Sequence, residues 1–335
     1  YTTTEDAANQ TNAVDPVNVS NWVNQQIIYT TITENTTWCY NTALLTLEVR
    51  TTHANDASLE ACDDDGTEDG LYTFDLQDAE ADILSGLPNN LDIAYYETYE
   101  DALLETNAIG TTYTNTQPFS QIIYVRVENQ NACFGINQIQ LTVLKLPDII
   151  QEDNAIYCLN SFPETITIDG GVINDSPSNY YYNWSNGEVA SYIEINEPGT
   201  YSVTVTNTQG CSKNRTIHVL PSNMATIDTI EVNDASNNNT LTILVSGEGQ
   251  YTFALDNNNG PYQDSNFFEN VTPGFHTVFV KDLNGCGISD ELVSVIGFPK
   301  FFTPNNDGHN DTWQVKGINA QFQPNAVIYI FDRHG

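Results

Sequence analysis

Residues 201–219 read YSVTVTNTQGCSKNRTIHV, which is two alternating segments on either side of a turn. Val203 and Val205 alternate with hydroxyl side chains in the first segment, and Ile217 and Val219 alternate with polar ones in the second. A period of two with one apolar face is typical of a strand that packs on one side only. Together with the Asn-to-Gly turn, the pattern predicts a β-hairpin.

Similar strand signals recur along the whole chain. Residues 122–127 and 139–143 flank an Asn-rich turn and predict a second hairpin. Residues 97–104 carry acids early and two leucines late, so a strand followed by a short turn of helix is expected there. About seven short strands per unit, separated by turn signals, predict an all-β fold of tandem immunoglobulin-like β-sandwich domains.

Two internal repeats divide the chain. Residues 96–124 repeat residues 1–29 at an offset of 95 (96−1 and 124−29), and residues 273–286 repeat 198–211 at an offset of 75 (273−198 and 286−211). A fixed long period indicates an array of similar domains. Because the first residue falls inside a repeat, more of the array is expected upstream. The expected domains are the C-terminal part of one repeat at 1–54, a complete repeat at 55–147, β-sandwiches at 148–221 and 222–298, and a truncated further module at 299–335.

The charge balance narrows the classes of partner. Nine Lys and Arg residues stand against 44 Asp and Glu, a net charge of −35. This disfavours nucleic acid, which needs cations against its phosphates, and equally disfavours anionic lipid surfaces. It favours solubility, repulsion between neighbouring domains and the binding of divalent cations.

Enzyme motifs are missing from the sequence. The histidines are scattered, and neither a Gly-x-Ser-x-Gly nor a His-Glu-x-x-His motif occurs. We therefore predict that this chain is not an enzyme.

Two oxygen-rich loops are candidate calcium sites. In the run 63–70, DDDGTEDG, carboxylates alternate around glycines, and Asp63, Asp65 and Asp69 are the predicted ligands. In the loop 304–311, Asp307 and Asp311 are the predicted ligands. The alternatives are a solvated acidic turn for the first loop and a plain linker turn for the second. Calcium is the only cofactor that the sequence suggests.

The six cysteines favour an extracytoplasmic disulfide framework, since none forms a Cys-x-x-Cys pair or a zinc cluster. In an immunoglobulin-like sandwich, the start of the first strand and the loop between the last two strands lie at the same end. On this argument Cys62 is expected to pair with Cys133, and Cys158 with Cys211, each pair within one module.

Repeat arithmetic leaves two cysteines without partners. The partner of Cys39 falls at 62−95 = −33, before the chain, and that of Cys286 falls at 158+75 = 233, which is Asn233. Cys39 and Cys286 are thus expected to be unpaired, and Cys286 to be buried. A rival pairing across domain joints, Cys39–Cys62 and Cys133–Cys158, stays open because its sequence separations are similar.

Aromatic residues offer a candidate glycan platform. Trp22, Trp184 and the run Tyr180-Tyr181-Tyr182 are the candidates. Core packing is the competing interpretation, because large aromatic side chains in a sandwich usually fill the core.

The sequence changes character near its end. Residues 297–313, GFPKFFTPNNDGHNDTW, are followed by IYIFDRHG at 328–335. This pattern resembles the gliding-motility-associated C-terminal domain, the type B sorting domain of the type IX secretion system of Bacteroidota. Asn306 stands where that family has glycine. The resemblance implies export through the type IX translocon, and retention at the outer membrane by a PorP/SprF-like protein.

The upstream modules resemble the repeats of large Bacteroidota surface proteins. Residues 62–66 resemble their longer repeat, whereas Trp184-Ser185-Asn186-Gly187 with residues 198–201 resembles a shorter, PKD-like one. The expected function is a structural or adhesive cell-surface stalk for adhesion or gliding, with an unknown surface ligand or glycan and self-association into a filament as further expectations. The alternatives are the non-catalytic sorting tail of a large secreted hydrolase, or a carbohydrate-binding module array.

Overall fold

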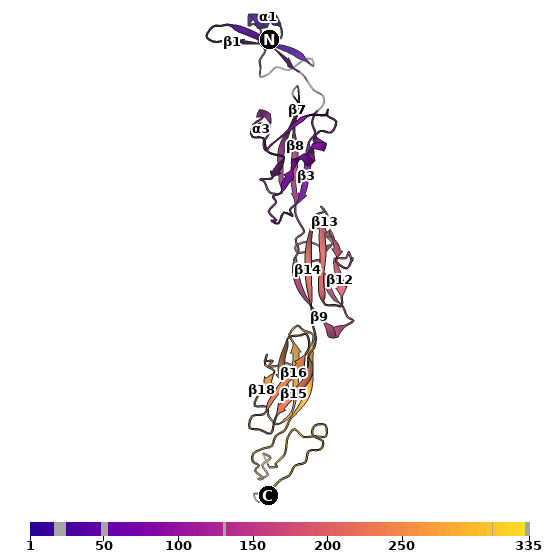
Figure 1. Ribbon diagram of the computed structural model, residues 1–335. Coiled ribbons are helices and arrows are strands. Elements are labelled where there is room, and N and C mark those ends of the chain that lie inside the picture. The colour runs from indigo at the N-terminus through magenta and orange to yellow at the C-terminus, as the bar shows by residue number, and fades with distance from the viewer. Residues whose placement is uncertain (17–24, 48–52, 130–131, 310, 332–335) are drawn as a thin grey trace. The chain divides into compact units, whose positions relative to one another are not determined.

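The computed structural model describes residues 1–16, 25–47, 53–129, 132–309 and 311–331 (Figure 1). These residues form two compact units, Tyr1–Leu146 and Pro147–Gly335. Almost all of the regular structure is β-strand, as the alternating patterns predict.

The first unit begins with a short helix and a hairpin and continues with a complete sandwich. Helix α1 (Thr4–Asn9) precedes the antiparallel hairpin β1 (Gln26–Thr33) and β2 (Tyr40–Leu47). The sandwich then has one sheet of order β3-β8-β7-β5 facing a second of order β4-β6. Its elements are β3 (Ala57–Cys62), β4 (Thr73–Asp75), η1 (Leu76–Ala79), α2 (Glu80–Ile83), β5 (Asp92–Tyr96), α3 (Tyr99–Leu104), β6 (Thr112–Thr114), β7 (Ser120–Asn129) and β8 (Ala132–Leu144).

The two longer helices of the first unit, α1 and α3, begin with the same kind of N-terminal cap. The capping residues, Thr3 and Thr98, are 95 positions apart. Thr3 Oγ1 accepts the backbone N–H of Asp6, and Thr98 Oγ1 accepts that of Asp101, both at 3.1 Å. Such side-chain acceptors satisfy N–H groups that a helix start leaves free. The hydrogen bond from the Thr98 hydroxyl is also the main reason why the pKa of Asp101 lies below its usual value. The expected turn of helix within 97–104 is confirmed as α3, whereas the strand before it, β5, ends at Tyr96 and so precedes that stretch.

The second unit begins with a sandwich built on the opening hairpin of the sequence. Its sheets have the orders β11-β13-β14-β9 and β10-β12. The core side chains Val203, Val205, Ile217 and Val219 are each at most 2% exposed, which confirms the predicted apolar face. The elements are β9 (Glu152–Cys158), η2 (Leu159–Ser161), β10 (Ile166–Asp169), η3 (Pro177–Asn179), β11 (Tyr180–Trp184), β12 (Tyr192–Ile195), β13 (Gly199–Asn207) and β14 (Ser212–Ser222).

A further sandwich completes the second unit. Its sheets have the orders β15-β16-β18 and β17-β19-β20 around a core of buried aliphatic residues and Phe253. The strands are β15 (Thr226–Asn233), β16 (Thr240–Ser246), β17 (Tyr251–Leu255), β18 (Phe267–Phe268), β19 (Gly274–Asp282) and β20 (Ile288–Val295).

The segment after β20 folds back on itself and also contacts the last sandwich, where the Phe275 ring of β19 lies 5.7 Å from that of Phe322. Gly297 and Lys316 exchange two backbone hydrogen bonds. Trp313 Nε1 donates to the Pro299 carbonyl at 3.0 Å, and its ring lies 5.9 Å from that of Phe298. The motif residues 332–335 lie outside the described part of the chain.

In two modules the first strand pairs in parallel with the last one. Strand β3 runs beside β8 with Cys62 opposite Leu144, and β9 runs beside β14 with Cys158 opposite Ser222. A first strand that is parallel to the last ends where the last strand ends. This direction decides which cysteines can meet.

Candidate functional site at the joint of two modules

A disulfide joins the two sandwiches of the second unit. Cys158 is the last residue of β9, and Cys286 lies in the turn between β19 and β20. Their Cα atoms are 5.3 Å apart, and 128 positions of sequence separate them. The bond therefore connects the module of β9–β14 covalently to the module of β15–β20.

Asn160 adds two hydrogen bonds across the same joint. Its Nδ2 donates to the Cys286 carbonyl at 3.2 Å, and its Oδ1 accepts the Met224 N–H at 3.1 Å. Gly287 has a φ of +135°, and a Cβ there would lie 2.7 Å from Met224 Cγ. Glycine is thus required beside the cysteine both by backbone conformation and by space.

Asp282 organises the turn that carries Cys286. This carboxylate is 1% exposed, and its Oδ2 accepts the Ser222 hydroxyl at 3.1 Å and the Cys286 N–H at 3.0 Å. Its Oδ1 accepts the Gln250 N–H at 3.2 Å. A buried carboxylate is stable only when its oxygens receive hydrogen bonds, and these three supply them. Because Ser222 ends β14, the network spans both modules.

The structure overturns the predicted pairing of Cys158 with Cys211, and with it the prediction that Cys286 is unpaired. Parallel pairing places Cys158 beside Ser222, whereas Cys211 directly precedes the other end of the eleven-residue strand β14. At about 3.3 Å per residue these ends are roughly 35 Å apart. Disulfides require Cα atoms within about 7 Å.

The same geometry contradicts the Cys62–Cys133 pairing. Cys62 lies opposite Leu144, at the far end of β8 from Cys133, whose side chain lies outside the described residues. The rival pairing, Cys39–Cys62 and Cys133–Cys158, is also wrong. Cys39 is a free, exposed thiol, and Cys158 is bonded to Cys286. Cys62 and Cys211 are each disulfide-bonded. Cys62 ends its module's first strand as Cys158 does, and Cys211 precedes its last strand as Cys286 does.

The carboxylates of the acidic run 63–70 accept hydrogen bonds from backbone N–H groups within the run and directly after it. Asp63 is 2% exposed, and its Oδ2 accepts the Gly70 N–H at 3.0 Å. Its Oδ1 is buried and has no partner among the described residues. Asp65 Oδ1 accepts the Thr67 N–H, and Asp69 Oδ1 accepts the Leu71 N–H, so both side chains stabilise local turns.

The second oxygen-rich loop is also closed by its own carboxylates. Asp311 accepts the backbone N–H groups of Asn305, Asn306 and Gly308 at 2.6–3.1 Å. Asp307 accepts the His309 N–H at 2.7 Å, and this bond is the main cause of a pKa below the usual Asp value. Such bonds from a carboxylate to nearby backbone N–H groups are typical of tight turns.

Within the described ranges, no three His, Cys, Asp or Glu side chains lie close enough together to hold a metal ion. Calcium at Asp63, Asp65, Asp69, Asp307 or Asp311 therefore stays a prediction. The described helices are all too short or too polar to cross a membrane.

The aromatic candidates separate into core and surface. Trp184 is 2% exposed and donates its Nε1–H to the Ala190 carbonyl at 2.8 Å, so it fills the core. Tyr182 is 7% exposed, whereas Tyr181 is 69% exposed on the opposite side of β11. Trp22 lies outside the described residues.

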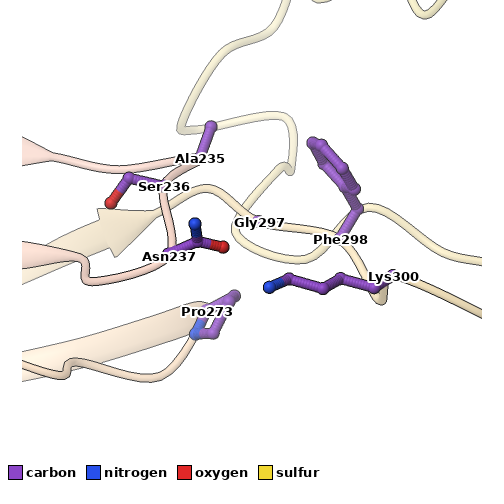
Figure 2. A pocket seen from close by; sticks show the side chains of 7 residues that line it. All are labelled: Ala235, Ser236, Asn237, Pro273, Gly297, Phe298 and Lys300. Carbon is purple, nitrogen blue, oxygen red and sulfur yellow. The ribbon is translucent and has the colours of Figure 1, made fainter.

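A cavity of about 420 Å³ lies where the last sandwich meets the segment that follows it (Figure 2). The Lys300 side chain extends towards Asn237 and Pro273, with Phe298 beside it. Ala235, Ser236 and Gly297 complete its lining.

Two family models match parts of the chain. Residues 58–147 match the Flavobacterium inter-domain disulphide bond domain, and residues 296–335 match the CHU_C type IX secretion signal domain. The fold is that of tandem immunoglobulin-like β-sandwiches. Residues 296–335 are a type IX secretion signal domain, a match that confirms the resemblance found at 297–313. The signal domain implies secretion to the cell surface or the medium.

Solved structures of similar fold include chains of several immunoglobulin domains. The N-terminal eight domains of Down Syndrome Cell Adhesion Molecule are 14% identical with a TM-score of 0.30, and the match covers 80% of this chain but only 45% of that one. Titin domains I67–I69 are 11% identical with a TM-score of 0.25, covering 73% and 95% of the two chains. Murine CEACAM1b is 8% identical with a TM-score of 0.29, covering 43% and 95%. At these scores the likenesses carry no argument about function. No curated protein matches the chain.

Proposed function

We propose that the chain is a non-catalytic structural segment of a cell-surface protein, a stalk of sandwiches whose modules are linked covalently. The Cys158–Cys286 disulfide carries this proposal, because it ties two successive modules together directly before the secretion signal domain. Adhesion or gliding is the use that we propose for such a stalk, since both require a surface protein to sustain pulling.

The mechanical consequence follows from the path of the chain. When tension is applied, it passes from Cys158 across the sulfur bridge to Cys286 and bypasses the residues between them. Unfolding either sandwich then lengthens the molecule little. The bond limits extension even after the cores, which hydrophobic burial stabilises, have opened.

The proposed partners follow from the signal domain. The type IX secretion machinery is implied by the match at 296–335. A PorP/SprF-like protein that retains the chain at the outer membrane is our proposal, as is side-by-side association into a filament. The excess of carboxylates works against close association of copies at low salt, so such filaments are expected to need screening ions or a cation.

Single-molecule stretching tests the structural function. In a chain with Cys62→Ser and Cys211→Ser, so that Cys158–Cys286 is the bond under study, reduction should release about 128 residues of hidden length. At about 3.5 Å per residue this is roughly 450 Å of extra extension. The matched control adds Cys158→Ser and Cys286→Ser and should show the longer extension without reductant. Equal extension in both chains before reduction would contradict the load-bypass proposal.

Calcium binding at the acidic run is a second, separate proposal. The buried Oδ1 of Asp63 lacks a hydrogen bond among the described residues, which is costly for a carboxylate. A hard cation held by oxygens would satisfy it. Calcium should therefore raise the melting temperature of the first unit by about 5 °C, and Asp63→Asn should abolish the rise. Asp92→Asn, at an exposed acid of β5, is the control. A melting temperature indifferent to calcium and to chelator would end this proposal.

A further inference from the structure

A second cavity lies within the module of β9–β14, beside the two-stranded sheet β10-β12. Its volume is about 290 Å³, close to the lower limit of small-molecule sites. Tyr182, Tyr192 and Asp169 line it, together with the backbone of Gly170 and Gly171. All of these residues belong to one module, so the cavity does not depend on any joint.

Two glycines of the lining leave room for the side chains that shape the cavity. A Cβ on Gly170 would lie 2.3 Å from the Tyr182 ring, and one on Gly171 would lie 2.7 Å from the Arg215 guanidinium. Gly171 also has a φ of +70°, which side-chain-bearing residues rarely adopt. The Tyr182 hydroxyl donates to the Pro177 carbonyl at 2.8 Å, and this bond fixes the ring as a wall.

Two groups in the cavity are available to a ligand. Tyr192 is 53% exposed, and no hydrogen bond of its hydroxyl occurs within the described part of the chain. Asp169 lies opposite it in the strand register, and its Oδ1 accepts the Gly171 N–H at 2.8 Å. Its Oδ2 has no partner among the residues that the structure describes. The site therefore offers the half-exposed ring of Tyr192 and the carboxylate of Asp169, whose side chain is 70% exposed.

The charge of the site favours a neutral ligand. Arg215, 4% exposed, lies beside Gly171 with Nη2 2.8 Å from Asp153 Oδ2 and 3.9 Å from Asp169 Oδ1. This buried cation pairs mainly with Asp153 and lies at the outer limit of an ion pair with Asp169, so it compensates part of the Asp169 charge. Anionic ligands are repelled by a chain of net charge −35.

We propose that this cavity binds one ring of a neutral sugar. The C–H face of the ring packs on Tyr192, as apolar rings do on exposed aromatic side chains. A sugar hydroxyl donates to Asp169 Oδ2, which lies across the strand pair from Tyr192. The inference rests on the adhesive part of the proposed function and names its ligand class, whereas the load-bearing part does not depend on it.

Saturation-transfer NMR on the full chain tests the site with cellobiose, mannobiose, lactose and N,N′-diacetylchitobiose as probes. At least one of these neutral disaccharides should bind with saturation. Tyr192→Ala should lower the association constant about tenfold, as expected for the loss of one aromatic stacking partner. Tyr192→Phe should retain binding, and Tyr181→Ala, at an exposed tyrosine outside the cavity, should leave it unchanged.

Three results would overturn the sugar site. They are no binding of any probe at millimolar concentration, binding that survives Tyr192→Ala, and equal loss in the Tyr181→Ala control. Far-ultraviolet circular dichroism of each variant excludes a loss of fold as the cause. The stretching experiment has its own readout, so a failure here is distinguishable from a failure of the stalk.

Discussion

Replacing Cys158 and Cys286 together by serine should destabilise the second unit by about 5 kcal/mol. The disulfide closes a stretch of 128 residues, and the cost follows from the chain entropy that such a closure removes from the unfolded state. For a unit of this size the melting temperature should fall by roughly 10–20 °C. Differential scanning calorimetry of the wild-type and double-variant chains measures the shift.

The control for this prediction is Cys39→Ser, which removes a free, exposed thiol and should leave the melting temperature unchanged. If the double variant has the same melting temperature as this control, the disulfide contributes no stability. A large fall should be accompanied by loss of hydrogen-exchange protection in the turn at Asp282, because its carboxylate holds the Cys286 N–H.

Arg215→Met should cost about 3 kcal/mol, although methionine has similar length and packs well in apolar surroundings. The guanidinium donates to the carbonyls of Ile150 and Asp169 at 2.7 and 3.1 Å and to Asp153 at 2.8 Å. Methionine leaves these acceptors unpaired, two of them backbone groups. Arg215→Lys should recover only part of the loss, since an ammonium cannot reach three acceptors in a fork.

The pH dependence separates this ionic role from packing. The hydrogen bond from Arg215 is the main reason why the pKa of Asp153 lies below its usual value. A depressed folded-state pKa stabilises the protein above the unfolded pKa, about 3.9 for Asp, and this stability is lost as pH falls through the folded value. The gap between wild type and Arg215→Met should thus narrow below about pH 4. Calorimetry at pH 7 and pH 3 measures it, and a constant gap would contradict the ionic contribution.

The sequence predicts the strands and the module type well because period-two alternation is local information. Val203 and Val205 face the core for the reason that their spacing suggests. The signal domain could be predicted from the sequence equally well, since its motif residues lie close together in the chain.

The cysteine partners could not be found in the same way. Their positions depend on β9 running parallel to β14, which is a long-range pairing with no local signature. The predicted pairing assumed that Cys158 lies at the start of the first strand, but it lies at the end of that strand. Cys158 is therefore at the opposite end of the sandwich from the one expected. The role of Asp282 could not be predicted for a similar reason. An acidic residue before a turn does not indicate that it will be buried and bonded to Ser222, sixty positions away.

The bridge between Cys158 and Cys286 has a consequence for survival outside the cell. Secreted proteases cut most readily at exposed loops, and several connect the strands between these two cysteines. A single cut there divides the backbone but leaves both pieces joined through sulfur. Everything that precedes Cys158 then stays attached to the secretion signal domain.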